Sequence, residues 1–224
     1  MITIIKTFIF AILISLSTAV FANYGSEICN SSPFKCYQVK HGESWQSLFP
    51  DEKKRDLVMR INRMNTRIYS GLVIAIPTSN DTNVMDYSPM PKQISAPGGK
   101  LILVSLEKLA FGAYNSNGTL AYWGPVSGGK GYCSDLGSTC KTPRGKFSIQ
   151  SKEGAGCIST MFPIGKGGAP MPYCMYFTYL YALHGYHEVP GYNASHGCVR
   201  VFISDARWLN REFTAGGHTT IEIE

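Results

Sequence analysis

The stretch "LHGYHEVPGYNASHGCVRVF", residues 183–202, decides how this chain folds around one of its cysteines. Glycine, proline and asparagine fill its middle, so that part is expected to form a loop. If residues 195–201 form a strand, His196, Cys198 and Arg200 project to one face, because side chains alternate along a strand. We therefore expect an imidazole, a thiol and a guanidinium to share one surface.

The chemistry of this surface depends on the protonation of Cys198. A free thiol titrates at about pH 8.5, so a base or a cation close by is needed to release the thiolate at neutral pH. Two histidines suit that role: His196 beside the cysteine, and His184, which the loop can fold back against it. Gly197 lets the backbone approach a substrate and leaves nearby amides available to an oxyanion. A disulfide beside a packed histidine is the alternative that the residues themselves leave open.

The cysteines indicate a protein with disulfides. The chain has seven cysteines, and an odd number leaves at least one thiol unpaired within the molecule. Cys198 alone lacks a near partner. This pairing by proximity is a hypothesis, because sequence does not choose among the connectivities. The neighbouring pairs are Cys29 with Cys36, Cys133 with Cys140, and Cys157 with Cys174.

Working outward from Cys198, residues 100–224 are expected to form a mainly β domain, large enough for one core. Its apolar runs "LILVSL", "LAFGAY", "GKFSIQ" and "HTTIEI" are short and bounded by turn residues, which is typical of strands. Only "ISDARWLNREF" has the pattern of a helix, with Ser204 as its predicted N-cap.

The segment 37–77 has a different pattern, which predicts a small β-α-α-β unit. A short strand leads through an N-cap at Ser44 into a first helix, and a strand closed by Pro77 ends the unit. Residues 78–99 are rich in Pro, Ser, Asn and Gly and are interpreted as a linker. Residues 23–36 form a separate N-terminal segment. The second helix is predicted from the helical spacing of Leu57, Val58, Ile61 and Met64.

Residues 1–22 predict export of the chain. They carry one lysine and a short apolar run that ends in small residues, the pattern of a secretory signal peptide cleaved after Ala22. No later stretch is long and apolar enough to span a membrane, so no span is expected after cleavage. A net charge of +6 suits an acidic polymer, and export favours a cell-wall polymer over nucleic acid. We expect a periplasmic or cell-envelope location.

Two resemblances become specific at this point. The motif "SHGCVR" preceded by "HG", with "TPRGKF" at 142–147 and "MPYCMYF" at 171–177, resembles the L,D-transpeptidase catalytic domain, the YkuD family. Residues 37–77, with "YQVKHGESW", "RINRMN" and "GLVIAIP", resemble a LysM module, which binds glycans containing N-acetylglucosamine. The first implies a YkuD-like β-sandwich or barrel with one or two short helices. The second implies a glycan-binding unit, although Glu43 and Trp45 depart from its usual residues.

The YkuD resemblance implies a role for the residues that match its motif. Cys198 corresponds to the nucleophile and His184 to the general base, with the backbone carbonyl of Gly185 orienting the imidazole. A second histidine, His187, lies in the short segment between the two motifs and is an alternative candidate for the base.

The same resemblance implies supporting roles around the thiol. Ser195 and His196 correspond to residues that shape the site, and the amides of Gly197 and Cys198 to an oxyanion hole. Arg200 is placed to hold a substrate carboxylate. The resemblance implies neither a cofactor nor a metal.

The implied reaction is acyl transfer on peptidoglycan. Cys198 attacks a tetrapeptide stem, D-alanine leaves, and a thioester remains until an amine resolves it. That amine is a stem diaminopimelate or a lysine of a wall-anchored lipoprotein, and water as the acceptor makes the chain an L,D-carboxypeptidase. A peptidase of the NlpC/P60 kind is disfavoured, because there the cysteine precedes the histidine.

Two further alternatives remain from the sequence. A non-catalytic peptidoglycan-binding wall protein combines the same two units without turnover. A zinc site is conceivable but lacks a helical His-x-x-His motif and an accompanying carboxylate motif. The potential ligands of such a zinc site are His184, His187, His196 and Cys198.

Overall fold

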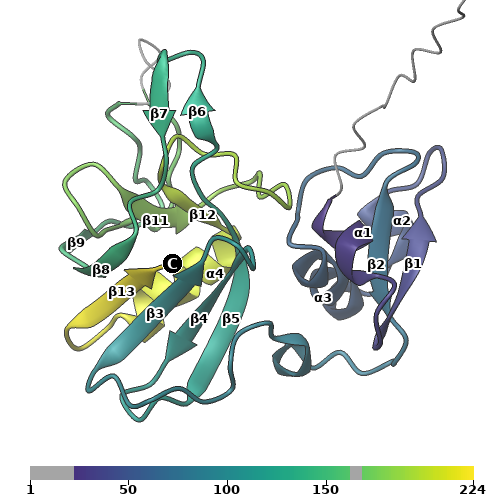
Figure 1. The fold of residues 1–224 in the computed structure, drawn as a ribbon, viewed down its shortest axis with the longest axis horizontal. Helices are drawn as coiled ribbons and strands as arrows, with labels where there is room; N and C mark the ends of the chain where they lie inside the picture. The colour runs from purple at the N-terminus through teal and green to yellow at the C-terminus, as the bar shows by residue number, and fades with distance from the viewer. Residues whose placement is uncertain (1–22, 162–167) are drawn as a thin grey trace, which may run out of the picture.

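The computed structural model describes residues 23–161 and 168–224, and its larger part is a curled nine-stranded sheet (Figure 1). The strand order is β8-β13-β3-β4-β5-β12-β11-β10-β9. A separate hairpin of β6 and β7 extends from it. The strands are β3 (Lys100–Ser105), β4 (Ala110–Tyr114), β5 (Leu120–Ser127), β6 (Gly131–Cys133), β7 (Ser138–Cys140), β8 (Gly145–Ser148), β9 (Ser151–Lys152), β10 (Met175–Tyr176), β11 (Ala182–Gly185), β12 (Val199–Val201) and β13 (Thr219–Ile223).

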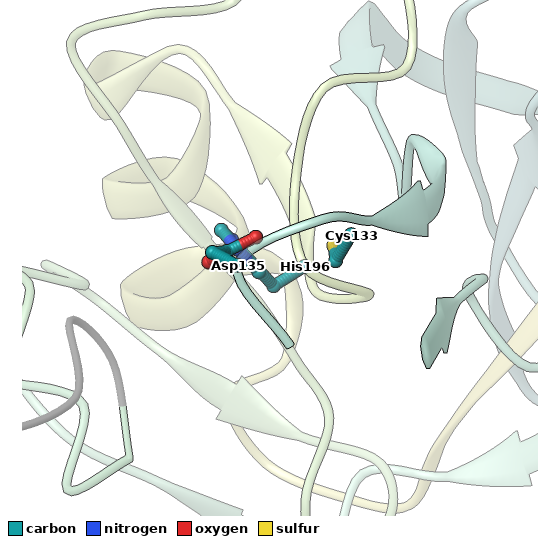
Figure 2. A group of neighbouring side chains, drawn as sticks. All are labelled: Cys133, Asp135 and His196. Atoms are coloured by element: carbon teal, nitrogen blue, oxygen red, sulfur yellow. The ribbon is translucent and has the colours of Figure 1, made fainter. Parts of the chain in front are cut away.

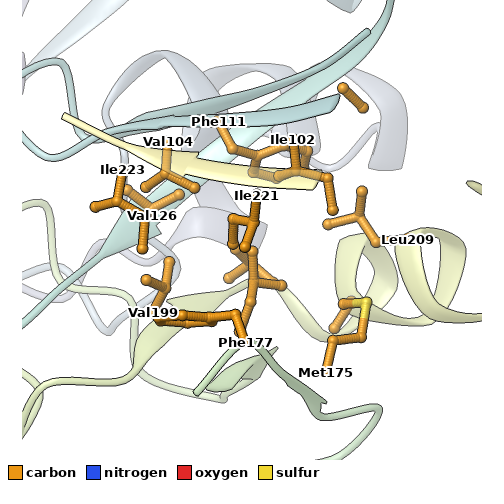
Figure 3. Close-up of a cluster of buried hydrophobic side chains, with 14 of the residues drawn as sticks. Ile102, Val104, Phe111, Val126, Met175, Phe177, Val199, Leu209, Ile221 and Ile223 are labelled. Atoms are coloured by element: carbon orange, nitrogen blue, oxygen red, sulfur yellow. The ribbon is translucent and has the colours of Figure 1, made fainter. Parts of the chain in front are cut away.

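The core lies between the two halves of this curled sheet (Figure 3). Ile102 and Phe111 come from one half, and Met175, Phe177 and Val199 come from the other. Each of these five side chains is at most 1% exposed, and burying such a side chain contributes roughly 1.5 to 3 kcal/mol. The short apolar runs of the sequence therefore form strands because each turns one face into this core. The predicted mainly β architecture is confirmed.

The helical end of the domain differs from the prediction in how it starts. Helix α4 spans Ile203–Trp208, and its N-cap is Phe202, which makes no side-chain capping hydrogen bond. Ser204 therefore lies inside the helix, and the prediction that it caps the helix is wrong. Burial of Phe202 and Ala206 against the sheet starts this helix in place of a polar cap. A π-helical turn, Leu209–Phe213, continues α4.

The N-terminal unit, residues 23–77, has the predicted β-α-α-β order in its second part. Ser44 caps the first of the two helices, as predicted, by accepting a hydrogen bond from the amide of Ser47. The two strands pair antiparallel, with Cys36 opposite Ala75. The elements are α1 (Tyr24–Ile28), β1 (Phe34–Gln38), α2 (Trp45–Leu48), α3 (Glu52–Ile61) and β2 (Val73–Pro77).

Three disulfides join the cysteines in the pairing suggested by their proximity. The free cysteine among the described residues is Cys198. A disulfide that closes a short loop reduces the number of conformations open to the unfolded chain. This effect stabilises the glycine-rich segments around this thiol. The pairs are Cys29–Cys36, Cys133–Cys140 and Cys157–Cys174.

The segment 78–99 is ordered against the domain that follows it. It contains a short 3-10 helix, η1 (Val84–Tyr87), and the indole of Trp123 donates to the carbonyl oxygen of Val84 over 2.7 Å. The hydroxyl of Tyr114 donates to Pro91 over 2.9 Å. The segment predicted to be a linker is held along the sheet by these contacts, because buried indole and phenol groups require hydrogen-bond partners.

Two buried arginines attach the N-terminal unit to the sheet domain. Arg60 donates to both carboxylate oxygens of Asp205. Arg63 lies between two aromatic rings, 4.6 Å from the centroid of Tyr24 and 4.8 Å from that of Trp123. The two parts of the molecule therefore share a polar interface that is closed to solvent.

None of the helices in the described ranges is long and apolar enough to cross a membrane. The predicted signal peptide, residues 1–22, lies outside the described residues.

Candidate functional site

A cleft of about 530 Å³ contains the free thiol. We call it the Cys198 cleft. It opens beside the β11–β12 pair, and the aromatic rings of Tyr176, Tyr181 and Tyr186 form part of its wall. A largely apolar hollow into which a few polar groups converge is the usual character of a ligand site. Five residues that the sequence singled out line it: His184, Ser195, His196, Cys198 and Arg200.

His184 reaches this cleft from β11. This strand pairs parallel with β12, so that His184 lies opposite Arg200. The ring nitrogen Nδ1 lies 2.9 Å from the carbonyl oxygen of Gly185. A carbonyl only accepts, so Nδ1 carries the proton and Nε2 is the basic nitrogen of the neutral ring. Burial, with a smaller contribution from the charge of Arg200, lowers the pKa of His184 to about 4.

Cys198 ends the turn that leads into β12. Burial raises the pKa of its thiol, while a hydrogen bond from the backbone of Ala182 and the positive charge of Arg200 act in the opposite direction. The resting cleft therefore holds both a neutral thiol and a neutral imidazole. A base must take the thiol proton when a substrate arrives, and a pair of this kind is suited to that step.

The turn before Cys198 is closed by the side chain of Ser195. Its hydroxyl donates to the carbonyl oxygen of Cys198 over 2.5 Å and accepts from the amide of Gly197 over 2.9 Å. Gly197 has φ +121°, a conformation that favours glycine. A Cβ there would lie 2.4 Å from Cε1 of Tyr181.

This turn corrects two sequence-based expectations. The strand begins at Val199, so residues 195–198 form a turn, and His196, Cys198 and Arg200 reach the same cleft without sharing one continuous strand. The amide of Gly197 is bonded to Ser195 and is not available to an oxyanion in this state. A side chain that bonds to its own backbone competes with strand pairing, and this delays the start of the strand to Val199.

His196 is held from outside the turn. Its Nε2 lies 2.7 Å from Oδ2 of Asp135, which follows β6 in the hairpin closed by the Cys133–Cys140 disulfide (Figure 2). The hydrogen bond from His196 lowers the pKa of Asp135. Both histidines line the cleft, but His196 is bonded to the hairpin whereas His184 is buried.

The fold does not assemble the ligand set of the zinc alternative. His187 is turned outward, with 65% of its side chain exposed. Cys133, Asp135 and His196 do come within ligand distance of one another (Figure 2), but the sulfur of Cys133 belongs to a disulfide. Cysteine binds a metal as a thiolate, and a sulfur in a disulfide is not a thiolate.

Arg200 lies over an aromatic ring in the cleft. Its guanidinium carbon is 4.2 Å from the centroid of Tyr186. Among the described residues no carboxylate forms an ion pair with it. Burial lowers its pKa, and a buried guanidinium in a cleft attracts an anionic ligand.

Sequence reasoning missed two residues of this site. Tyr186 lies inside the quoted "HGYH", where the two histidines drew attention and the ring between them did not. Asp135 lies between two cysteines in "CSDLGSTC", and a lone carboxylate in a paired-cysteine loop is the one signal that indicates it. No local pattern places Asp135 beside His196, and none shows that the ring of Tyr186 packs on Arg200.

A family model matches the larger part of the chain. Residues 99–223 match the model of the YkuD family, the L,D-transpeptidase catalytic domain. Among solved structures, an L,D-transpeptidase from Xylanimonas cellulosilytica has a TM-score of 0.57 at 21% identity, over 84% of this chain and 97% of that one. At that identity the likeness shows the fold alone. No curated protein matches the chain.

Two other structures are more distant. An L,D-transpeptidase from Stackebrandtia nassauensis has a TM-score of 0.48 at 19% identity, over 78% of this chain and 67% of that one. L,D-transpeptidase 1 of Mycobacterium tuberculosis has a TM-score of 0.42 at 21% identity, over 70% and 67%.

Proposed function

This chain belongs to the YkuD family of L,D-transpeptidases, and we propose that it transfers the acyl group of a peptidoglycan tetrapeptide stem through a thioester on Cys198. The observation that carries the proposal is the placement of the free thiol and a buried, neutral histidine in one cleft. Members of the family are acyltransferases. The roles given below to individual residues are part of our proposal.

The first half of the reaction forms the acyl-enzyme. Nε2 of His184 takes the thiol proton of Cys198, and the sulfur attacks the carbonyl carbon of the third stem residue. A backbone amide stabilises the tetrahedral oxyanion. We assign this role to the amide of Cys198, because the amide of Gly197 already donates to the hydroxyl of Ser195. The C–N bond then breaks, His184 returns the proton to the leaving nitrogen, and D-alanine departs.

The second half transfers the acyl group. An amine attacks the thioester carbon, His184 accepts a proton from it, and the C–S bond breaks to restore the thiol of Cys198. A stem diaminopimelate gives a cross-link, and a lipoprotein lysine gives a wall-anchored protein. Water gives carboxypeptidase activity, which is the alternative outcome at the same site.

Arg200 is the residue that we assign to the substrate carboxylate. Its guanidinium is held over Tyr186 and lacks an acidic partner among the described residues. A carboxylate in the stem peptide would neutralise the charge of Arg200, and a guanidinium forms two parallel hydrogen bonds to such a group.

The N-terminal unit offers a second site for the same polymer. A hollow of about 550 Å³ lies between the loop after β1 and the segment before β2, where Tyr69 is 64% exposed. We propose that a glycan strand binds there, as the LysM resemblance implies, because exposed rings stack on sugar faces. Cosedimentation with purified peptidoglycan sacculi tests this: Tyr69→Ala should weaken binding several-fold, whereas Tyr132→Ala, also exposed but on the hairpin, should not.

The disulfides support export, and we propose that the protein works in the periplasm or cell envelope, where peptidoglycan is found.

Intact mass spectrometry tests the proposed reaction. Residues 23–224 are incubated with a disaccharide-tetrapeptide muropeptide, alongside Cys198→Ala and His184→Gln. We expect an adduct equal to the substrate minus D-alanine, absent in Cys198→Ala and formed far more slowly in His184→Gln. If neither adduct nor free D-alanine forms while the thiol is confirmed reduced, the protein is a peptidoglycan-binding protein without turnover.

A further inference from the structure

The loop between β11 and β12, residues 186–194, connects the two halves of the Cys198 cleft. Its end near Cys198 is tied to the sheet domain. The hydroxyl of Ser127 donates to the carbonyl oxygen of Tyr192 over 2.7 Å, and Oδ1 of Asn193 accepts from the amide of Gly128 over 2.8 Å. At the other end, next to His184, the amide of Tyr186 donates to the carbonyl oxygen of Val201 in β12 over 2.9 Å, so it is the middle of the loop that needs another support.

The middle of the loop is held by the N-terminal unit. Oδ1 of Asn65 accepts from the amide of Val189 over 2.8 Å, and the amide of Asn65 donates to the carbonyl oxygen of Val189 over 2.9 Å. Met64 and Pro190 form an isolated antiparallel bridge beside them. Figure 1 shows this loop leaving the sheet and reaching toward α3. The side chain of Val189 is completely buried.

Asn65 also approaches the start of the loop. Its Nδ2 lies 3.5 Å from the carbonyl oxygen of Tyr186. One side chain from the N-terminal unit thus contacts the loop at two points, three residues apart in the chain. Because α3 is anchored by the buried pair of Arg60 and Asp205, Asn65 is presented on a fixed support.

The residue at the start of the loop is the one that packs on the catalytic groups. The ring of Tyr186 lies under the guanidinium of Arg200 at 4.2 Å. It also meets the ring of His184 edge-on, with 6.0 Å between centroids. A displacement of the Tyr186 ring would therefore act first on the guanidinium of Arg200, which packs directly on it.

We propose that Asn65 is a positioning residue, through which the N-terminal unit holds the loop 186–194 and keeps Tyr186 and Arg200 aligned for a substrate carboxylate. The inference deepens the proposed function by making the N-terminal unit part of the active site's support, in addition to any glycan binding. Its effect on Arg200 is measurable without turnover.

A pair of thiol reagents measures that effect in residues 23–224. Iodoacetate is anionic and iodoacetamide is neutral, so the ratio of their rates with Cys198 reports the positive charge next to the sulfur. Arg200→Gln sets the ratio for a site without the cation. Measurements at low ionic strength keep this attraction from being screened.

We expect Asn65→Ala to lower the iodoacetate to iodoacetamide ratio about threefold or more, toward the value of Arg200→Gln. Asn62→Ala is the matched control: Asn62 is 1% exposed and bonds within the N-terminal unit to Val58 and Ala75. This control should lower the melting temperature yet retain the wild-type ratio. A wild-type ratio in folded Asn65→Ala, or an equal fall in both variants, would overturn the proposal.

Hydrogen exchange of the unaltered protein gives a test that needs no variant. The amides of Asn65 and Val189 should exchange slowly and at similar rates, because they form one two-point contact. Exchange of the Val189 amide as fast as that of an exposed loop would contradict the contact between Asn65 and the loop, which we call the Asn65 clamp.

The steady-state parameters link the clamp to the proposed function. With a stem peptide, Asn65→Ala should raise KM about tenfold and change kcat less than twofold, because it disturbs carboxylate binding and leaves the nucleophile in place. A fall in kcat at constant KM would overturn the assignment to Arg200. If no variant turns over the peptide while the reagent ratio behaves as expected, the proposed reaction is wrong and the clamp stands.

Discussion

Arg60 of α3 and Asp205 of α4 form a two-point ion pair, with Nη1–Oδ2 and Nη2–Oδ1 distances of 2.8 and 2.7 Å. Their side chains are 3% and 0% exposed. The hydroxyl of Tyr122 donates to the same carboxylate over 2.8 Å. Burial alone would lower the pKa of Arg60, but the charge of Asp205 raises it above its ordinary value. Since α4 follows directly from the strand after Cys198, this pair fixes the N-terminal unit to the element behind the active site.

Removing one partner of this pair should be more damaging than removing both. Arg60→Met leaves a buried, unpaired carboxylate, and we expect a loss of about 3 to 5 kcal/mol in the free energy of unfolding. Arg60→Met combined with Asp205→Leu removes both charges and should recover most of that loss. Urea unfolding of the two single variants and the double variant measures the coupling, and additive losses would show that the pair does not act as a unit.

The pH dependence of acylation should follow the buried imidazole. His184 accepts the thiol proton only when it is neutral, and burial lowers its pKa from 6.5 to about 4. The acylation rate should therefore stay nearly constant as the pH falls from about 7 to about 5.5, and halve near pH 4. Mass-spectrometric rates on protein confirmed to be folded by circular dichroism test this. A midpoint near the ordinary histidine value would show that His184 is solvated or is not the base.

The same group should make folding sensitive to acid. Because the pKa of His184 is lower in the folded state, the unfolded chain binds the proton first, and stability is lost as the pH falls from 6.5 toward 4. Above that window the group has no effect. By the size of the shift the loss is about 3 kcal/mol relative to His184→Gln. Denaturant unfolding of both proteins at several pH values gives the difference, and parallel curves would contradict the prediction.

The turn before Cys198 should not tolerate a side chain. Gly197→Ala combines a positive φ with a contact of 2.4 Å to the ring of Tyr181. We expect acylation to fall about 100-fold, since small displacements of a nucleophile have effects of that order. Gly216→Ala is the matched control, with φ +78° and open space around the added carbon. Equal activity of the two variants would mean that the turn does not position Cys198.

Much of the site could be predicted because its residues are close in sequence. Cys198 stood out as the cysteine without a near partner, and the three disulfides joined the neighbours that proximity suggested. Short loop closures of this kind are favoured in the unfolded chain as well as in the native one. The strand runs were recognisable because each has its own apolar pattern.

Local patterns failed where a tertiary contact replaced a local preference. Ser204 has the side chain of a helix cap, but the N-cap lies two residues earlier, at Phe202, which is buried against the sheet. The segment 78–99 has the composition of a flexible linker, but Trp123 and Tyr114 hold it by hydrogen bonds to its backbone. Burial outweighs propensity in both cases.

By itself the sequence indicated the main strands and the free cysteine and suggested the neighbouring disulfides, because each depends on a short span of residues. Only the tertiary structure decided that Arg60 reaches Asp205, 145 residues away, and that Asp135 orients His196 from 61 residues away. It also decided that Asn65 holds the loop beside Arg200, across 124 residues. Such pairs have no periodicity to reveal them, since their partners meet only when the sheet curls and the N-terminal unit packs against it.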